Sequence, residues 1–201
     1  EKMRQLLAED MRAGALGLST GLEYDPGIYS SRDEVLTLAR EAAANGGRYI
    51  SHIRSEDRDL WSSVDELVRI GRETGMPVQI SHAKLAMTDW WGQAGKLVAK
   101  LDRARADGVD VTLDIYPYDY WHSGLSVLWP ERNFDNRDVA EFILAHLTTP
   151  SNLRLVSYPP EPSLAGKTIA DIAKQKGADP VNVLMDLARR ASDEGSGARI
   201  L

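Results

Sequence analysis

The strongest constraint on the fold is a regular alternation of strand-like and helix-like segments along the first part of the chain. Short apolar segments occupy 14–20, 47–53, 77–82 and 109–118, and helical periodicity marks 2–13, 34–46, 60–74 and 93–107. One unit takes about 30 residues, which is typical of βαβ crossovers. We therefore predict an α/β fold with a parallel sheet and helices outside it. Four units match half of a TIM-type (β/α)8 barrel better than a complete doubly wound domain.

Local signals support the predicted helix ends. Ser31 and Glu34 form a capping box at the start of one helix, and Gly75 stops the next. The strands are short and almost continuously apolar, as expected for strands buried on both faces. No glycine fingerprint for a dinucleotide is present, and Glu161 stands where a phosphate loop would need a glycine before Gly166. Thr168 is therefore interpreted as a helix cap.

After Pro117 the alternation stops. An aromatic segment at 118–136 shows no strand pattern, and it leads to predicted helices at 137–147, 169–176 and 180–191 with one strand at 153–158. Asp179 followed by Pro180 is typical of an N-cap and the first helical position. We divide the chain into a partial barrel at 1–118 (strands four to seven), an α-rich excursion or subdomain at 119–195, and the start of a truncated segment at 196–201.

Composition excludes several classes of protein. A net charge of −6 and a pI near 5.3 argue against a nucleic-acid surface. No apolar run is long enough to span a membrane, and we expect a cytoplasmic protein. The absence of cysteine removes disulfides and thiolate metal ligands. The first residues already lie in an amphipathic helix and the last ones begin an apolar run, so we expect an interior part of a longer protein.

Two of the four histidines stand in matching sequence frames. His52 lies in Ile-Ser-His-Ile-Arg and His82 in Ile-Ser-His-Ala-Lys, one βα unit later. Active-site residues of a parallel barrel project from the carboxyl ends of its strands. Both imidazoles should therefore face the same mouth, where neutral histidine nitrogens suit Zn²⁺. The alternative is that each histidine only caps its strand through local hydrogen bonds.

Three ordered motifs resemble a known family. They read GLSTGLEYDPGIYSSRDEVLTLAREAAANGGRYISHIR, then SVDELVRIGRETGMPVQISHAK, then DVTLDIYPY. This pattern is similar to the D-aminoacylase (N-acyl-D-amino-acid deacylase) branch of the amidohydrolase superfamily. The resemblance covers about 14–118 strongly, and LAGKTIADIA and DPVNVLMDL echo a later segment of the family.

The resemblance implies a zinc-dependent hydrolase on a (β/α)8 barrel that cleaves the amide bond of N-acyl-D-amino acids. His52 and His82 would be the metal ligands of strands five and six. Lys84 and Tyr116 match positions that hold the carboxylate of the small-molecule substrate, which an ammonium and a phenol can grip. The His-x-His pair, the bridging residue and the general-base Asp of the family have no counterpart here. We expect them outside this chain, and we expect this chain alone to be inactive.

For several other residues the sequence allows either a functional or a structural role. Glu23 could favour a polar or basic substrate, but we expect it to face solvent. Asp114 could orient a ligand histidine or make an inter-strand hydrogen bond. Arg54 and the charged run at 55–59 could border the mouth, although charge runs are usually solvated. Four residues are expected to have structural roles only: packing or solvent exposure for His122, a helix-dipole contact for His146, and packing for Trp90 and Trp91.

Rival functions also stay open. The chain could belong to another amidohydrolase, such as a cyclic-amide hydrolase. A barrel enzyme could instead use Lys84 as a Schiff-base nucleophile. A third possibility is a non-catalytic structural fragment that associates with itself through exposed sheet edges.

Overall fold

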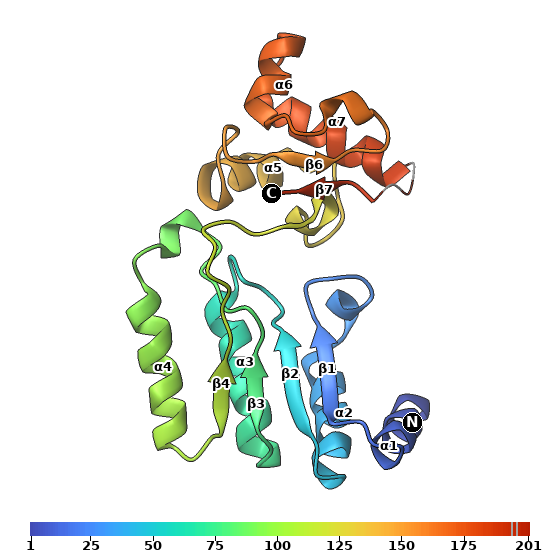
Figure 1. Ribbon diagram of the computed structural model, residues 1–201, viewed down its shortest axis with the longest axis vertical. Helices are drawn as coiled ribbons and strands as arrows, with labels where there is room; N and C mark the ends of the chain where they lie inside the picture. The colour runs from blue at the N-terminus through green and yellow to red at the C-terminus, as the bar shows by residue number, and fades with distance from the viewer. Residues whose placement is uncertain (194, 196) are drawn as a thin grey trace. The chain divides into compact units, whose positions relative to one another are not determined.

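The computed structural model describes residues 1–193, 195 and 197–201. The chain forms two compact units (Figure 1). The first unit contains Glu1–Ala86 and Trp90–Tyr116, and the second contains Met87–Asp89 and Pro117–Leu201. Among the described helices, none has the length and apolar character needed to cross a membrane.

The first unit follows the predicted alternation of strands and helices. Its strands are β1 (Gly17–Gly21), β2 (Arg48–His52), β3 (Val78–Ile80) and β4 (Val111–Leu113). Its helices are α1 (Lys2–Arg12), α2 (Arg32–Ala44), α3 (Leu60–Thr74) and α4 (Ala94–Ala106), with a short 3₁₀ turn at η1 (Gly27–Tyr29). A second 3₁₀ turn, η2 (Thr88–Trp90), lies where the chain passes between the two units. Every strand and helix predicted from the periodicity of this part is confirmed, with shifted ends.

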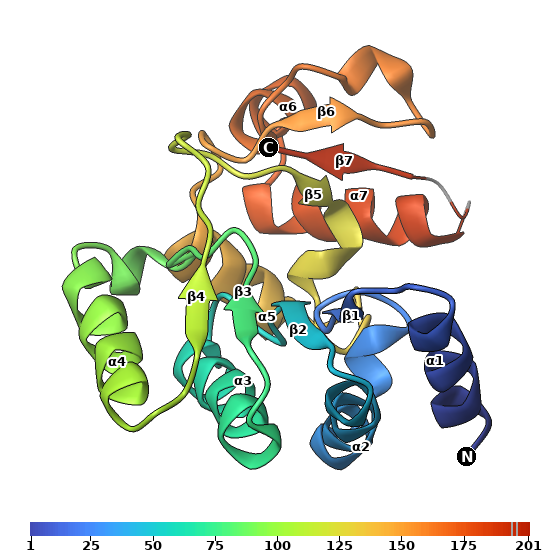
Figure 2. The same cartoon turned by 60° about the horizontal axis from the view of Figure 1, so that its bottom comes forward.

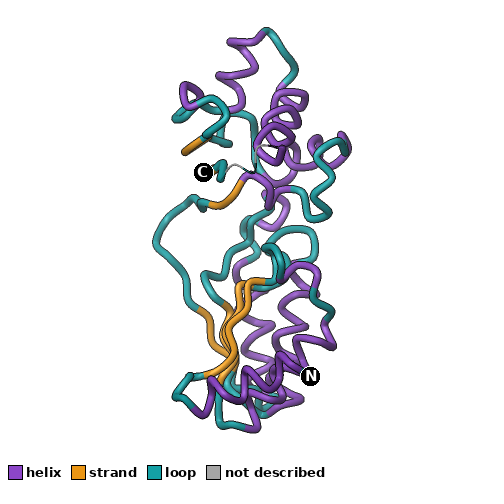
Figure 3. Tube along the Cα trace, turned by 90° about the vertical axis from the view of Figure 1, so that its right-hand side faces the viewer, coloured by secondary structure: helices purple, strands orange, loops and turns teal. Residues whose placement is uncertain are grey.

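The four strands form one parallel sheet in the order β1-β2-β3-β4. Figure 3 shows the helices of this unit on one side of the sheet. Helix α2 contacts β1 and β2, α3 contacts β3, and α4 contacts β4. The first unit thus forms an α/β layer with a four-stranded parallel sheet.

The core lies between the sheet and these helices. Tyr49, Val78 and Val111 are neighbours across three strands, and all are almost fully buried. Helix α3 approaches the sheet closely at Gly71, where an added Cβ would lie 2.7 Å from Val109 Cγ1. Glycine at this position therefore sets the distance between the helix and the strand.

The opposite face of the sheet carries a different row of residues. Ser19, Ile50, Gln79 and Thr112 are aligned across the four strands, and all keep some solvent exposure. The expectation that both faces are buried is therefore wrong for this chain, because helices cover one face only within the described residues. His52 follows Ile50 by two residues, so its side chain belongs to the uncovered face.

The second unit contains more strand than the sequence suggested. Its strands are β5 (Ser123–Gly124), β6 (Leu155–Ser157) and β7 (Arg199–Ile200), and its α-helices are α5 (Arg137–Phe142), α6 (Ile169–Lys176) and α7 (Pro180–Asp193) (Figure 2). Helix α5 continues as the π-helical turn η4 (Ile143–Leu147), and 3₁₀ turns form η3 (Leu125–Leu128) and η5 (Pro162–Leu164).

The three strands of the second unit form an antiparallel sheet in the order β5-β7-β6. The expectation of a strandless aromatic segment is wrong at β5, whose two residues are too few to show a period. Arg199–Ile200 is the middle strand of this sheet, because it pairs with both neighbours.

The predicted helix boundaries rest on observed hydrogen bonds. Ser31 Oγ accepts from the backbone N–H of Glu34, and Gly75 ends α3 in the left-handed conformation. Thr168 and Asp171 form a reciprocal capping box, so the interpretation of Thr168 as a cap is confirmed. Asp179 accepts a hydrogen bond from the backbone of Val181 at the start of α7.

Candidate metal centre

His52 is the last residue of β2 and one of the few buried polar residues of the first unit. Its side chain projects from the face of the sheet that the helices do not cover. Its backbone carbonyl accepts a hydrogen bond from the N–H of Leu22. The outer ring nitrogen, Nε2, lies 2.7 Å from Glu23 Oε2. An ionised carboxylate only accepts hydrogen bonds, so this contact favours a proton on Nε2 and a lone pair on Nδ1.

His82 lies two residues beyond the end of β3, so the prediction that it ends the strand is off by this short turn. Its backbone has a φ of 40°, in the left-handed region that residues other than glycine seldom adopt. Asp114 stabilises this conformation, because its Oδ1 accepts the His82 backbone N–H at 2.6 Å and its carbonyl accepts the N–H of Ala83 at 2.8 Å. The strained turn brings the His82 ring back toward β2.

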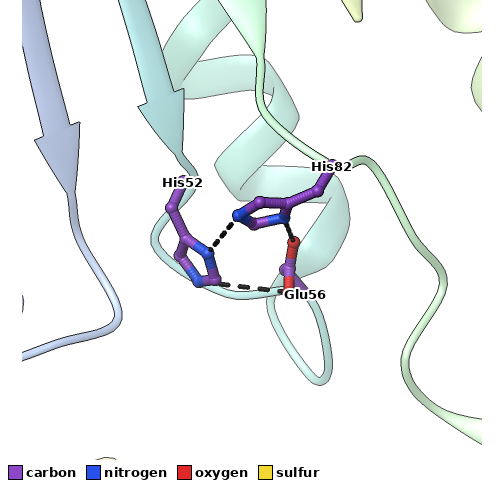
Figure 4. Close-up of side chains that lie close together, drawn as sticks. All are labelled: His52, Glu56 and His82. Atoms are coloured by element: carbon purple, nitrogen blue, oxygen red, sulfur yellow. Dashed lines mark hydrogen bonds and ion pairs between the residues drawn. The ribbon is translucent and has the colours of Figure 1, made fainter. Parts of the chain in front are cut away.

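The two imidazoles meet at their inner nitrogens. His52 Nδ1 and His82 Nε2 are 3.0 Å apart, and the ring centroids are 4.7 Å apart (Figure 4). The prediction that both histidines face one place is therefore confirmed geometrically. Two histidine nitrogens bound to one tetrahedral zinc lie roughly 3.3 Å apart, since each Zn–N bond is about 2.0–2.1 Å. The spacing of this pair is close to that value.

A third group, Glu56, was missed by the sequence analysis. It belongs to the charged run at 55–59, which was expected to be solvated, yet it is 6% exposed. Its Oε1 lies 3.1 Å from His82 Nδ1, and its Oε2 lies 3.9 Å from His52 Nε2. Donor atoms of His52, Glu56 and His82 all lie within 4.8 Å of one another. The only sequence signal was a carboxylate four residues after the first histidine.

Charged neighbours shift the pKa values of Glu56 and His82. Burial acts to raise the pKa of Glu56, but hydrogen bonding from His82 and the charge of Lys84 outweigh it, and the pKa is lowered. The hydrogen bond to Glu56 raises the pKa of His82. The carboxylate is thus favoured in its ionised form, which is the form that binds cations.

Lys84 and Tyr116 lie beside the histidine pair. The Lys84 ammonium is 2.5 Å from both oxygens of Glu56 and 2.8 Å from His82 Nδ1. It also lies 5.7 Å from the centroid of the Tyr116 ring. Burial and the charge of Glu56 raise the pKa of Tyr116 to about 12, so its phenol keeps its proton at neutral pH. All four residues predicted from the resemblance therefore gather at one edge of the sheet.

The donor set fits a divalent cation of the zinc type. His52 presents Nδ1 inward because Glu23 faces its other nitrogen. His82 Nδ1 lies within reach of both Glu56 and Lys84, so the proton of this ring can sit on either nitrogen. With the proton on Nδ1, donated to Glu56, both inner nitrogens offer lone pairs to one ion. Imidazole and carboxylate are both ordinary zinc ligands.

Comparison with known proteins gives a consistent result. The chain is 39% identical over 194 residues to N-acyl-D-glutamate deacylase from Alcaligenes xylosoxydans xylosoxydans, and 31% identical over 185 residues to the D-aminoacylase of the same organism. These matches cover 96% and 92% of the chain. No family model matches the chain.

Solved structures agree with these relatives. An N-acyl-D-glutamate deacylase from Bordetella bronchiseptica, complexed with zinc and a phosphonate inhibitor, superimposes with a TM-score of 0.76 at 34% identity. A D-aminoacylase structure gives 0.75 at 28% identity. Each match covers 98% of this chain and 36% of the solved one.

The chain is homologous to part of the N-acyl-D-amino-acid deacylases. It spans about a third of the length of the curated relatives it matches, 36% of one and 34% of the other. Its fold is accordingly an amidohydrolase-type α/β fold, with four parallel strands in the part described here.

Within this deacylase-like sheet, Glu23 is not where the sequence analysis expected it. Its side chain is 19% exposed and its carboxylate contacts His52, so the expectation of a solvent-facing residue is wrong. Burial raises the pKa of Glu23, although the hydrogen bond to His52 opposes this effect. The contact depends on how the loop after β1 folds, which no local pattern indicates.

The other candidates of the deacylase-like chain separate into two groups. Asp114 makes the expected inter-strand hydrogen bond, which it accepts from Gln79, and it also accepts the backbone N–H of His82. Arg54 does not border the histidine pair through its guanidinium. That group instead makes two hydrogen bonds of 2.9 Å with buried Glu66 on α3.

The other candidate histidines and tryptophans have surroundings of their own. His122 is exposed, and His146 pairs with Asp89 near the end of its helical turn. Trp90 packs against Trp61 as expected, whereas Trp91 is 65% exposed, so the packing predicted for it is wrong.

Proposed function

We propose that this chain is part of a zinc-dependent hydrolase that cleaves the amide bond of N-acyl-D-amino acids. The observation that carries the proposal is the convergence of His52 Nδ1 and His82 Nε2, 3.0 Å apart, at the carboxyl edge of a parallel sheet. The homology to N-acyl-D-glutamate deacylase and D-aminoacylase supports the same reaction. The products would be a carboxylic acid and a free D-amino acid.

In this proposal His52 and His82 hold the metal, and Glu56 orients the site. Glu56 accepts from His82 and fixes the Lys84 ammonium beside the pair. Bound zinc would polarise the acyl carbonyl and lower the pKa of a water molecule. We place the general base on an aspartate outside this chain, as the resemblance implies.

Lys84 and Tyr116 are proposed to hold the substrate carboxylate. The ammonium lies over the Tyr116 ring, and the phenol keeps its proton, so both groups can donate hydrogen bonds to an anion. Their position beside the histidine pair supports a carboxylate-binding role for both residues. A free D-amino-acid carboxylate is the group that every member of this substrate class carries.

The uncovered face of the sheet supports a barrel in the intact protein. In a closed (β/α)8 barrel, one face of every strand points to the interior and the other to the helices. Here Gln79, Thr112 and Asp114 are linked by hydrogen bonds on the uncovered face. We propose that 1–118 supplies strands four to seven, and that 119–195 is an excursion after them.

The Schiff-base alternative is less well supported. A nucleophilic lysine must lose its proton. The Lys84 nitrogen lies 2.5 Å from both oxygens of Glu56, so it is engaged in an ion pair rather than directed at a carbonyl. Borohydride with a carbonyl substrate is therefore expected to trap no adduct on Lys84.

The metal-binding part of the proposal is tested by zinc content and zinc affinity of this chain. We compare the wild type with a His52→Ala/His82→Ala double variant and with a His122→Ala/His146→Ala double variant as the matched control. The wild type and the control should each bind one zinc, and the first variant should bind none. Equal zinc in all three proteins, or no zinc in the wild type, would contradict the proposed site in this chain.

Activity is tested on the intact parent protein. It should hydrolyse N-acetyl-D-glutamate or another N-acetyl-D-amino acid, spare the L-enantiomer, and lose activity on chelation of zinc. This chain alone should not turn over the same substrates. Hydrolysis of a cyclic amide in place of the acyclic one would favour the cyclic-amide hydrolase.

We also propose that the chain by itself associates through its sheet edges. Within the described residues, β1 and β4 each pair on one side only, which leaves backbone N–H and C=O groups for another strand. Light scattering at increasing concentration measures this. A monomer at every concentration would contradict it.

A further inference from the structure

The loop that follows β1 makes a close contact with the last residue of β2. Leu22 donates its backbone N–H to the His52 carbonyl at 3.1 Å, which anchors the loop against the strand. The loop turns back on itself at Gly27, where an added Cβ would lie only 2.3 Å from the carbonyl oxygen of Gly21. This compact turn brings the side chains of Glu23 and Tyr24 onto the imidazole.

The two side chains contact different parts of the His52 ring. Glu23 Oε2 lies 2.7 Å from Nε2, the nitrogen that points away from His82. The Tyr24 ring packs on the imidazole with centroids 4.5 Å apart, and its hydroxyl is 3.4 Å from Nδ1. The distance to Glu23 is that of a strong hydrogen bond, and the distance to Tyr24 is near the limit for one. Glu23 therefore determines how the ring is held.

We propose that Glu23 is a positioning residue, which accepts the Nε2–H of His52 and so directs the Nδ1 lone pair toward His82. The inference rests on the proposed function in so far as the inner nitrogens bind zinc. Histidine ligands of metals are commonly held in this way, by a carboxylate on the nitrogen that does not bind the ion. Nothing in the sequence motifs assigns this role to Glu23.

The geometry supports a positioning role over a general structural one. Glu23 Oε2 contacts Nε2 of His52, and that atom is the one not facing the partner histidine. Both side chains are largely buried, so water competes little for this bond. Without an acceptor at this place, the ring could rotate or change its tautomer, and Nδ1 would no longer be reserved for a ligand.

The test compares Glu23→Leu and Glu23→Gln with the wild type. Leucine removes the acceptor at similar volume, whereas glutamine keeps an acceptor oxygen without the charge. Glu41→Gln is the matched control, because Glu41 is also a hydrogen-bonded carboxylate of the first unit but contacts Arg4. Circular dichroism checks that each variant is folded.

The first readout needs no metal. Long-range ¹H–¹⁵N spectra of the zinc-free protein should show His52 protonated at Nε2, with a ring proton protected from exchange with water. Glu41→Gln and Glu23→Gln should keep this signal, and Glu23→Leu should lose it. A wild-type His52 protonated at Nδ1, or an unchanged signal in Glu23→Leu, would overturn the inference.

The second readout is zinc affinity by chelator competition. Loss of an outer carboxylate typically weakens metal binding 10- to 100-fold, and we expect a loss in this range for Glu23→Leu, a loss of about threefold to tenfold for Glu23→Gln, and none for Glu41→Gln. Should Glu23→Leu fail to fold, unchanged affinity in Glu23→Gln would overturn the inference by itself.

The two proposals can fail separately. A wild type that binds no zinc would overturn the proposed metal site of this chain, while the tautomer of His52 would still decide the role of Glu23. Conversely, a wild type that binds zinc through His52 and His82, with variants of Glu23 indistinguishable from it, would overturn only the positioning role.

Discussion

The two histidines stand in nearly the same sequence frame but in different structures. His52 is the last residue of β2, and it is held through its side chain by Glu23. His82 lies beyond β3 with a left-handed backbone, and it is held through its main chain by Asp114. The repeated frame therefore brings each imidazole to the same edge of the sheet, but its surroundings decide how the ring is fixed.

The basic residues two positions after each histidine differ in the same way. Arg54 turns to Glu66 on α3 and links the loop to the helix layer. Lys84 turns to Glu56 and stays beside the imidazoles. One carboxylate is thus used to stabilise the fold and the other belongs to the histidine cluster. Variants of these neighbouring residues test whether one carboxylate stabilises the fold and the other serves the histidine cluster.

The largest expected effect comes from the structural member of this comparison. Glu66→Ala leaves the Arg54 guanidinium without its carboxylate in a mostly buried place, and we expect the free energy of unfolding to fall by about 3 kcal/mol. Urea denaturation followed by circular dichroism measures this loss. Zinc affinity of the folded protein should not change.

Glu73→Ala is the control for Glu66→Ala, because Glu73 lies on the same helix and its partners Arg40 and Arg69 are exposed. Its loss of stability should be much smaller. If Glu66→Ala weakened zinc binding at unchanged stability, Arg54 would have to be assigned to the metal site and the contrast between the loops would disappear.

The next effect concerns the backbone of the His82 loop. Asp114→Ala removes the acceptor for the His82 N–H, and we expect zinc affinity to fall about tenfold because the ring loses its fixed position. Asp114→Asn keeps an acceptor oxygen and should stay close to the wild type. Chelator competition measures both. If Asp114→Ala kept the zinc affinity of the wild type, the turn at His82 would form without the hydrogen bond to Asp114.

Glycine and alanine replacements should give effects of opposite sign at the two histidines. At position 82 the left-handed φ makes glycine the better residue, and His82→Gly should be more stable than His82→Ala by about 1 kcal/mol. At position 52 the strand favours alanine over glycine by about 0.5–1 kcal/mol. Thermal and urea unfolding of the four variants measure these differences, and the same sign at both positions would refute the contrast.

The smallest effect is expected for Tyr24→Phe. The hydroxyl is 3.4 Å from His52 Nδ1, too long for a strong hydrogen bond, and zinc would take that nitrogen. Zinc affinity should therefore stay within about twofold of the wild type. A tenfold loss would mean that the His52 ring is held from both sides, and that Glu23 is not its main support.

Much of the fold could be predicted from the sequence because its signals are local. The strands, helices and caps of the first unit follow from apolar periodicity and from residues such as Ser31 and Gly75. The meeting of His52 and His82 follows from the rule that parallel strands end at one edge, whereas Lys84 and Tyr116 are indicated only by the resemblance to the deacylase family. These inferences need no knowledge of tertiary packing.

The rest could not be predicted because it depends on loop closure and distant pairing. Glu23 and Glu56 stand in short polar loops, where a carboxylate usually faces water, and only the folded chain turns them inward. Strand β5 has two residues, and it exists because β7, far along the chain, lies beside it. In both cases the deciding partner is not a sequence neighbour.

The parallel register of the first sheet has a consequence for folding. Gly21 is paired with His52, and Ser51 with Ile80, so Glu23, His52, His82 and Asp114 reach one another only when all four strands are aligned. A slip of one residue in β2 would turn His52 to the helix-covered face. The imidazole pair therefore needs β2 and β3 in this register, and its contacts with Glu23 and Asp114 need β1 and β4 in theirs.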